Sequence, residues 1–203
     1  MQVYETCAAY ADGSLHNVIF SKATFLAEDG TLGGLIGTIL DITERKQAEL
    51  ELAAQKEFAD NLVQNSTTPT FVLDRQHRII IWNRACEKLT GVPAAEMLGT
   101  DQTWKAFYDH KRPILADYII DGNQEAIPEF YSSCSKSSLI PEGLQAEHWL
   151  PNLNGRAHYI FFTAAPIRNN RGELVAAIET IEDITDRKNR EEQLHKLSQA
   201  VEQ

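Results

Sequence analysis

The stretch Asp183-Ile184-Thr185-Asp186-Arg187-Lys188 decides the fold of this chain, because it recurs as Asp41-Ile42-Thr43-Glu44-Arg45-Lys46. The two copies lie 142 residues apart (183 − 41). The same spacing aligns Gly13 with Gly155, Gly30 with Gly172, Leu32 with Leu174, Ile36 with Ile178, Thr38 with Thr180, and Leu52 with Leu194. A shared register over roughly 40 positions predicts an internal repeat. We expect the repeated unit to be a set of strands that ends in Asp-Ile-Thr and continues directly into a charged helix.

The composition is that of an ordinary globular protein. Of the 203 residues, 43% are hydrophobic and 24% are charged, which leaves room for one full domain and part of another. The net charge of −10 argues against a nucleic acid or an anionic membrane surface as a partner. No apolar run approaches the ~18 residues that a transmembrane helix needs, and the first residues do not resemble a signal peptide. We therefore expect a cytoplasmic segment that does not contact the membrane.

The cysteines and the short motifs predict neither a metal site nor catalysis. Cys7, Cys86 and Cys134 lie far apart and form no Cys-x-x-Cys pair, so the sequence predicts no disulfide framework and no zinc site. This usage fits a reducing compartment. The sequence contains no glycine-rich phosphate loop, no Gly-x-Ser-x-Gly elbow and no His-Glu-x-x-His motif. His195 lacks the flanking pattern of a kinase phosphoacceptor, and we expect a segment that is not an enzyme.

Residues 1–40 are predicted to form two or three strands. Ala11-Asp12-Gly13 and Glu28-Asp29-Gly30 are turn signals, because glycine adopts positive φ without a steric penalty. So small a sheet would leave one face uncovered and would bury too little apolar surface to fold well alone. We interpret residues 1–43 as the back half of a domain.

A helix is predicted from Asp41 to about residue 65, with a cap from Asp41 or Thr43. Apolar positions spaced four and three residues apart predict a heptad seam, which is weakened by Gln55. The seam recurs after the second repeat, and its members are Ala48, Leu52, Ala59, Leu62, Leu194, Leu197 and Val201. Two readings stay open: a helix packed on its own domain, or a parallel two-stranded coil between subunits.

The remaining sequence predicts an α+β domain. Strands are expected at 69–74 and 78–82, followed by a helix over Arg84–Thr90 that Asn83 caps and Gly91 ends. A second apolar stripe predicts a helix from Pro113 to Gly122, and residues 123–142 are expected to be a loop. Three further strands at 144–150, 157–167 and 174–182 are joined by tight turns. This order predicts a five-stranded antiparallel sheet with short helices on one face, flanked by coiled-coil-type linker helices.

These elements together resemble a PAS domain with its C-terminal PAC segment. The resemblance covers residues 55–190, and residues 1–45 resemble the PAC half of a preceding PAS domain. It rests on Val72-Leu73-Asp74, Ile80-Ile81-Trp82-Asn83, Leu89-Thr90-Gly91, Leu98-Gly99, Asn154-Gly155, Pro166-Ile167, Gly172 and residues 183–188. The stretch from Trp104 to Gly122 is similar to PAS domains of bacterial sensor kinases and GGDEF-type cyclases. The expected division is a PAC part at 1–43, a linker helix at 44–65, a PAS/PAC domain at 66–185 and the next linker helix at 186–203.

The resemblance implies a sensory role. PAS domains sense small molecules, redox state or light, or act as dimerisation modules, and they pass a signal along the C-terminal helix. The resemblance assigns Asp183 to a pair with a basic group and Thr185 to a backbone hydrogen bond, and Asp41 and Thr43 to the same roles. It implies a homodimer through the linker helices and the PAS domain, with an output domain further along the same chain. The alternative is that both motifs are plain helix caps, each contributing about 0.5–2 kcal/mol.

The expected ligand pocket lies between the sheet and the helical region around residues 107–122. The candidate lining residues are Trp104, Phe107, Tyr108, Tyr118, Trp149, Tyr159 and Phe161. Aromatic rings of this kind would bind a small molecule by burial and ring contacts. The alternative is that the rings fill the core, which would make the domain a structural relay without a ligand.

A bound cofactor has weaker support and none is predicted, but a haem- or flavin-bearing redox or gas sensor stays open as a third alternative. Haem would need an axial ligand beside the pocket helix, and His110, His148 and His158 have no supporting motif. A flavin photosensor would need its cysteine within an Asn-Cys-Arg-Phe-Leu-like motif, whereas Cys86 lies in the wrong helix. Asp117 and Asp121 lie one helical turn apart, but a solvated helix face explains them better than a metal does.

Overall fold

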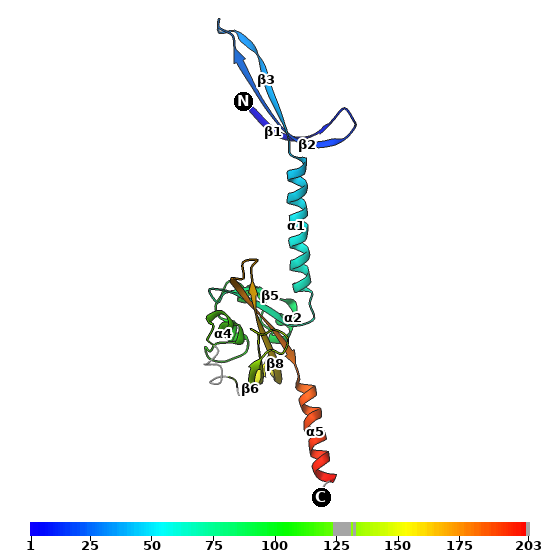
Figure 1. The fold of residues 1–203 in the computed structure, drawn as a ribbon, viewed down its shortest axis with the longest axis vertical. Coiled ribbons are helices and arrows are strands. Elements are labelled where there is room, and N and C mark those ends of the chain that lie inside the picture. Colours follow the sequence, from blue (N-terminus) through cyan, green and yellow to red (C-terminus); the bar gives the residue numbers. More distant parts are fainter. Residues whose placement is uncertain (124–130, 132, 202–203) are drawn as a thin grey trace. The chain divides into compact units, whose positions relative to one another are not determined.

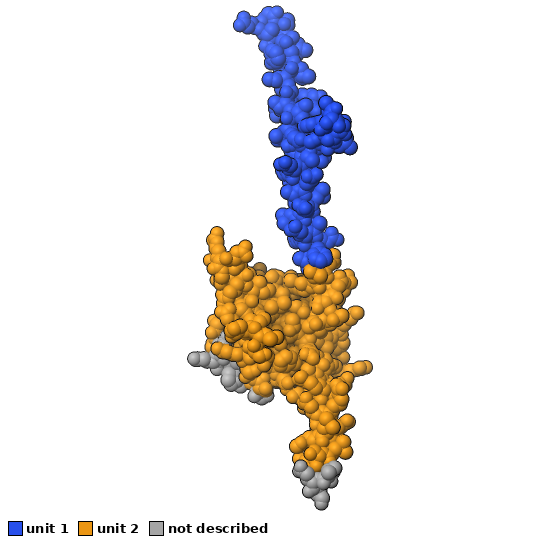
Figure 2. Space-filling model, turned by 45° about the vertical axis from the view of Figure 1, so that its right-hand side comes forward, with its two compact units in different colours: residues 1–60 blue, residues 61–203 orange. Residues whose placement is uncertain are grey.

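A computed structural model describes residues 1–123, 131 and 133–201 of the chain, with two compact units at 1–60 and 61–203 (Figures 1 and 2). In the first unit, β1 (Gln2–Ala9), β2 (Leu15–Leu26) and β3 (Leu32–Asp41) form an antiparallel sheet in that order. Helix α1 (Thr43–Gln64) follows β3 after one residue. No residue of α1 is buried.

The three-stranded sheet of the first unit keeps many apolar side chains exposed. Leu35 is 65% exposed, Ile39 59% and Leu40 60%. Val18 on β2 and Ile42 after β3 are buried. Exposure on this scale is what half a domain would show, because a sheet needs a covering layer to bury its apolar face. The division into a PAC half and a linker helix stays a prediction.

The second unit is built on a six-stranded antiparallel sheet in the order β5-β4-β9-β8-β7-β6. Its strands are β4 (Thr70–Asp74), β5 (Ile79–Trp82), β6 (Ser133–Lys136), β7 (Leu144–Leu153), β8 (Arg156–Arg168) and β9 (Leu174–Asp183). The α+β class is confirmed, but the expected count of five strands was wrong. The additional strand is β6, which lies in the stretch that the sequence predicts to be a loop. The prediction failed there because Ser-Cys-Ser-Lys shows no apolar alternation and is mostly exposed.

Short helices cover one face of this sheet (Figure 1). They are α2 (Arg84–Thr90), α3 (Ala94–Met97), the 3₁₀ turn η1 (Thr103–Ala106) and α4 (Leu115–Asp121). Asn83 caps α2 as expected, since its side-chain oxygen accepts the Cys86 N–H at 2.9 Å. Gly91 ends α2 in the left-handed conformation at φ 74°, which a residue with a side chain adopts only with strain.

The core lies between these helices and the sheet. Trp82 and Phe71 pack with ring centroids 5.5 Å apart, and Phe107 meets Phe162 edge to face at 5.8 Å. Leu73 and Leu115 are fully buried in the same cluster. Helix α5 (Thr185–Val201) leaves the sheet directly after β9. In the part of the chain that the structure describes, no helix is long and apolar enough to cross a membrane.

Candidate functional site

The connection from β9 to α5 is a closed set of hydrogen bonds. Asp183 accepts the Thr185 backbone N–H at 2.9 Å, and the Thr185 hydroxyl accepts the Tyr159 N–H at 2.9 Å. The Ile184 N–H donates to the Tyr159 carbonyl at 2.8 Å, and Ile184 is buried. The first residues of α5 are therefore tied to β8 as well as to β9. A displacement of either strand must move the start of the helix or break these bonds.

The first unit contains the same connection. Asp41 accepts the Thr43 N–H at 2.9 Å, the Thr43 hydroxyl accepts the Asn17 N–H at 2.9 Å, and the Ile42 N–H donates to the Asn17 carbonyl at 2.8 Å. The structure thus reproduces the sequence repeat bond by bond. We refer to residues 183–185 and 41–43, with their bonding partners, as the second and first joints.

The basic partner of each joint is a histidine that the sequence reading did not assign. His158 Nδ1 lies 2.8 Å from Asp183 Oδ2, and His16 Nδ1 lies 2.6 Å from Asp41 Oδ2. The available signal was the repeat itself, because the 142-residue offset that aligns Asp41 with Asp183 also aligns His16 with His158.

A glutamate on the neighbouring strand holds the first turn of each helix. Glu147 on β7 lies 2.5 Å from Lys188 Nζ and 3.1 Å from Arg187. Glu5 on β1 lies 2.6 Å from Lys46 Nζ and 3.6 Å from Arg45. These partners also obey the 142-residue offset (147 − 5). Each pair is partly exposed and contributes modestly to stability, but it fixes the direction in which the helix leaves the sheet.

The joint aspartates are stabilised in their charged form. Hydrogen bonds from the Thr43 side chain and backbone lower the pKa of Asp41 to about 2. At Asp183 burial raises the pKa, but hydrogen bonds from Thr185 and His158 outweigh it and leave the pKa below its ordinary value. Both carboxylates are therefore ionised at neutral pH and complement the N-terminus of the following helix.

The candidate pocket residues divide between the two faces of the sheet. Phe107 and Tyr118 are buried on the helix-covered face, with Trp104 and Tyr108 half-buried beside it. Trp149 and Tyr159 point away from the core at 44% and 36% exposure, and Phe161 alternates with the buried Phe162. The expectation that all seven residues line one interior pocket was therefore wrong. Successive side chains of a strand face opposite sides, so the alternation of Leu150, Ile160 and Phe162 could have revealed this.

The interior contains a carboxyl group that the sequence reading missed. Glu179 on β9 is 1% exposed, and its Oε2 accepts the Ala116 N–H of α4 at 2.8 Å. Its Oε1 has no hydrogen-bond partner among the described residues. Burial raises the pKa of Glu179 to about 8, so the group is largely neutral at pH 7. The sequence feature that could have indicated this group is a single Glu at an inward-facing position of an apolar strand.

An arginine lies among aromatic rings in the same interior. The guanidinium carbon of Arg112 stands 4.0 Å from the ring centre of Tyr108 and 4.9 Å from that of Tyr131. Both distances are within the range of a cation–π contact. Arg112 and Tyr131 are 9% and 2% exposed. The two rings and His148 pack edge to face, at centroid distances of 5.9 and 5.8 Å.

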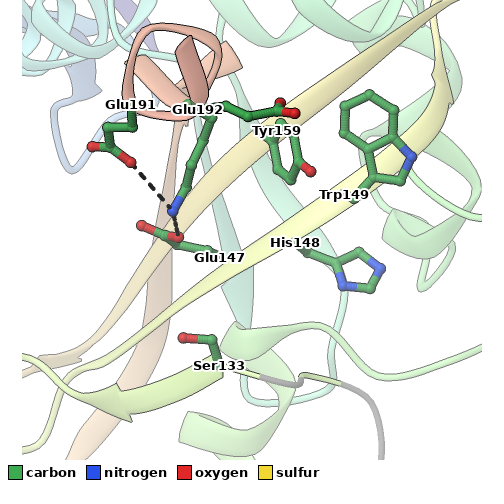
Figure 3. A pocket seen from close by; sticks show the side chains of 8 residues that line it. Ser133, Glu147, His148, Trp149, Tyr159, Glu191 and Glu192 are labelled. Atoms are coloured by element: carbon green, nitrogen blue, oxygen red, sulfur yellow. Dashed lines mark ion pairs between the residues drawn. The ribbon is translucent and has the colours of Figure 1, made fainter. Parts of the chain in front are cut away.

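The outward-facing rings border a pocket of about 490 Å³ at the start of α5 (Figure 3). Trp149 and Tyr159 are cross-strand partners with ring centroids 4.5 Å apart. Glu147 and Ser133 line the pocket from β7 and β6, and Glu191 and Glu192 line it from α5. Strands β6, β7 and β8 and helix α5 thus share one cavity.

A family comparison decides the identity of the second unit. The family model described as "PAS domain" matches residues 67–186, which is more than half of the chain. The chain belongs to the PAS domain family. No curated protein matches the chain in a sequence search.

Solved structures of PAS and light-oxygen-voltage proteins are similar to this chain. An RNA-binding light-oxygen-voltage receptor matches at 14% identity and a TM-score of 0.46, over 98% of this chain and 82% of its own. The PAS domain of BvgS from Bordetella pertussis matches at 22% identity and a TM-score of 0.41, over 71% of this chain and 98% of its own. The PAS domain of an HTR-like protein from Haloarcula marismortui matches at 19% identity and a TM-score of 0.45, over 68% of this chain and 99% of its own.

The histidines considered as haem ligands in this PAS domain have other partners. His110 is exposed and lies 2.5 Å from Asp109, and His158 belongs to the second joint. His148 packs against the Tyr108 and Tyr131 rings, and burial, followed by the nearby charge of Arg112, lowers its pKa.

The cysteine and the aspartates considered for a flavin or a metal also have structural roles. Cys86 is buried in α2, and burial raises its pKa to about 12, so it holds little reactive thiolate. Asp117 and Asp121 both contact His77, at 2.7 and 3.1 Å. These contacts fasten the turn between β4 and β5 to α4.

The predicted seam residues are exposed on both long helices. Leu52 is 69% exposed and Leu62 59% on α1, and Leu194 is 67% and Leu197 64% on α5. Ala48 and Ala59 are exposed as well, and the side chain of Val201 lies outside the described residues. The seam is therefore available for a partner helix, and pairing between copies stays a prediction.

Proposed function

We propose that this chain is a sensory and dimerisation module of a multi-domain bacterial signalling protein in the cytoplasm. A small molecule, or a signal arriving through α1, would shift the sheet of the PAS domain. The second joint would carry that shift into α5, and α5 would pass it to an output domain of the sensor-kinase or GGDEF-cyclase type. The segment itself would be non-catalytic and would act as a homodimer.

The observation that carries this proposal is the duplicated joint. Each copy ties a helix to three strands through the same aspartate, threonine, histidine and glutamate, at similar distances. A plain helix cap needs only the side-chain oxygen that accepts a backbone N–H. The additional strand and ion-pair contacts restrict how the helix leaves the sheet, which is what transmission of a shift requires. Coupling also requires a ligand or partner that binds the two states with different affinity.

A relay without a ligand is the second candidate. It is favoured by the large rings that fill the described core. The ring centroid of Phe107 lies within 6.3 Å of those of Phe71, Trp82 and Phe162. In that case the PAS domain would act as a spacer that transmits a change from α1 to α5. Native mass spectrometry of the purified chain separates the two candidates, because a sensor would retain or take up a small molecule and a spacer would not.

The joint is tested in the full receptor. Thr185→Ala and Asp183→Ala should change signal output strongly while the thermal unfolding midpoint falls only slightly. Thr185→Ser keeps a hydroxyl at the same place and is the matched control. Normal output from both alanine variants would refute a transmitting role for the joint.

A further inference from the structure

The pocket beside the second joint combines two exposed aromatic rings with three carboxylates. Trp149 and Tyr159 supply the rings, with centroids 4.5 Å apart. Among the lining residues, Glu147, Glu191 and Glu192 supply three carboxylates against the ammonium group of Lys188. Arg187 also contacts Glu147 at 3.1 Å and Glu191 at 4.0 Å, which offsets part of their charge. His148 adds no compensating charge at neutral pH, because burial lowers its pKa. The pocket therefore combines carboxylates with the electron-rich faces of two rings.

The internal repeat provides a comparison within the same chain. Glu147, Lys188 and Glu191 align at the 142-residue offset with Glu5, Lys46 and Glu49. The ion pair between strand and helix is present in both units, at 2.5 Å and 2.6 Å. These residues therefore belong to the joint itself.

The remaining pocket residues are particular to the second unit. At the same offset, Trp149 aligns with Cys7, Tyr159 with Asn17 and Glu192 with Leu50. The first joint forms its complete set of hydrogen bonds without the two rings and without the extra carboxylate. The rings and Glu192 are thus not needed to build a joint, and their exposure shows that they do not serve the core.

We propose that this pocket binds a small organic cation, an amine or quaternary ammonium compound. The faces of Trp149 and Tyr159 would attract the cation through their quadrupoles, and the Glu192 carboxylate would supply the opposite charge. Lys196 contacts Glu192 at 2.6 Å, but both side chains are more than 60% exposed, so this pair competes weakly in water. The cavity of about 490 Å³ is large enough for such a ligand.

The position of the pocket gives the ligand a direct effect on the helix. The rings stand on β7 and β8, whereas Glu192 stands on the second turn of α5. A bound cation bridges the sheet to the helix and stabilises the orientation in which the rings and the carboxylate face one another. This inference rests on the proposed sensory function and specifies the class of its ligand.

The test uses the whole chain with choline as the cationic probe. The uncharged isostere 3,3-dimethyl-1-butanol is the matched ligand control, at constant ionic strength. NMR titration follows the indole N–H signal of Trp149, assigned by its loss in a Trp149→Phe variant. Choline should shift this signal saturably, and the isostere should bind at least tenfold more weakly. No saturable shift with choline, or equal affinity for both compounds, would overturn the proposal.

The variants take their residues from the first joint. Trp149→Cys, Tyr159→Asn and Glu192→Leu together, under reducing conditions, should weaken choline binding at least tenfold and leave the far-ultraviolet circular dichroism unchanged. If that triple variant fails to fold, Glu192→Gln should still weaken binding at least threefold, and Glu49→Gln in the first unit should not. Unchanged affinity in Glu192→Gln would overturn the proposal. Choline binding with unchanged receptor output would instead contradict the sensory function and leave the site standing.

Discussion

The buried carboxyl of Glu179 offers the sharpest test of the interior, through the variant Glu179→Gln. The pKa of Glu179 is about 8 in the folded chain, against an ordinary value of 4.5. Between these two values the folded state holds a proton that the unfolded state has released. The free energy of unfolding therefore falls as pH rises through this window, by about 1.4 kcal/mol per pH unit. Above pH 8 this contribution is constant.

Glutamine at this position keeps the shape and the acceptor for the Ala116 N–H, but it does not titrate. The variant and the native chain should thus have similar stabilities near pH 5. At pH 7 the variant should be more stable by on the order of 3 kcal/mol, since 2.5 pH units separate 7 from 4.5. Burial raises the pKa values of the neighbouring Tyr108, Tyr131 and Cys86 above their ordinary values, so these groups stay neutral from pH 5 to pH 8 and do not contribute to the difference.

The assay is urea denaturation of both proteins at pH 5, 6, 7 and 8. Glu182→Gln is the matched control, because Glu182 lies on the same strand but is exposed. Glu182→Gln should change the free energy of unfolding only slightly, because it alters an exposed side chain. A constant difference between Glu179→Gln and the native chain across this range would refute the reasoning, because it would mean that Glu179 titrates as an ordinary solvated carboxyl.

Three further predictions concern the joint, the turn and the seam. Thr185→Ala should cost about 1 kcal/mol and should speed hydrogen exchange at the Tyr159 amide, which donates to Thr185; unchanged exchange would contradict this. Burial lowers the pKa of His77, but Asp117 and Asp121 outweigh it and leave the pKa raised. His77→Asn should therefore cost about 0.5–1 kcal/mol at pH 6 and less at pH 8 by urea denaturation, because stability gained from a raised pKa is lost as pH rises through it. An equal cost at both pH values would argue against the ion pair. Leu194→Asp should shift the sedimentation coefficient of the chain toward the monomer, whereas Glu191→Gln should not; the same oligomer in both would discredit the seam.

The elements that the sequence predicted are those with a local cause. Asn154 and Gly155 both adopt positive φ, at 50° and 81°, in a two-residue turn that pairs Leu153 with Arg156. The dipeptide alone specifies this hairpin. The same is true of the Asn83 cap and of the left-handed Gly91, because each depends on a few neighbouring residues.

The elements that the sequence did not predict depend on distant residues. β6 carries no strand pattern, and it pairs with the edge of β7 between Ser133–Lys136 and Leu144–Glu147. The partner of Asp183 lies 25 residues away, in His158. The contact of Trp149 with Tyr159 depends on the register of β7 against β8, which no single segment contains. A comparison of the two repeats could nevertheless have identified the histidine and the glutamate of each joint.

The repeat also distinguishes residues that build the joint from residues that are particular to one unit. The joint is the same in both units, down to the ion pairs of Glu5 and Glu147. The interior differs, since the position of Glu179 on β9 is occupied by Gly37 on β3. A glycine cannot bridge a sheet to a covering helix, whereas Glu179 accepts the Ala116 N–H of α4. What is shared must serve the exit of a helix from a sheet, and what differs must serve the particular contents of each unit. Exchanging the residues that differ between the units, in the interior or in the pocket beside the second joint, should therefore alter what the PAS domain responds to. Exchanging joint residues should alter whether a response reaches the helix.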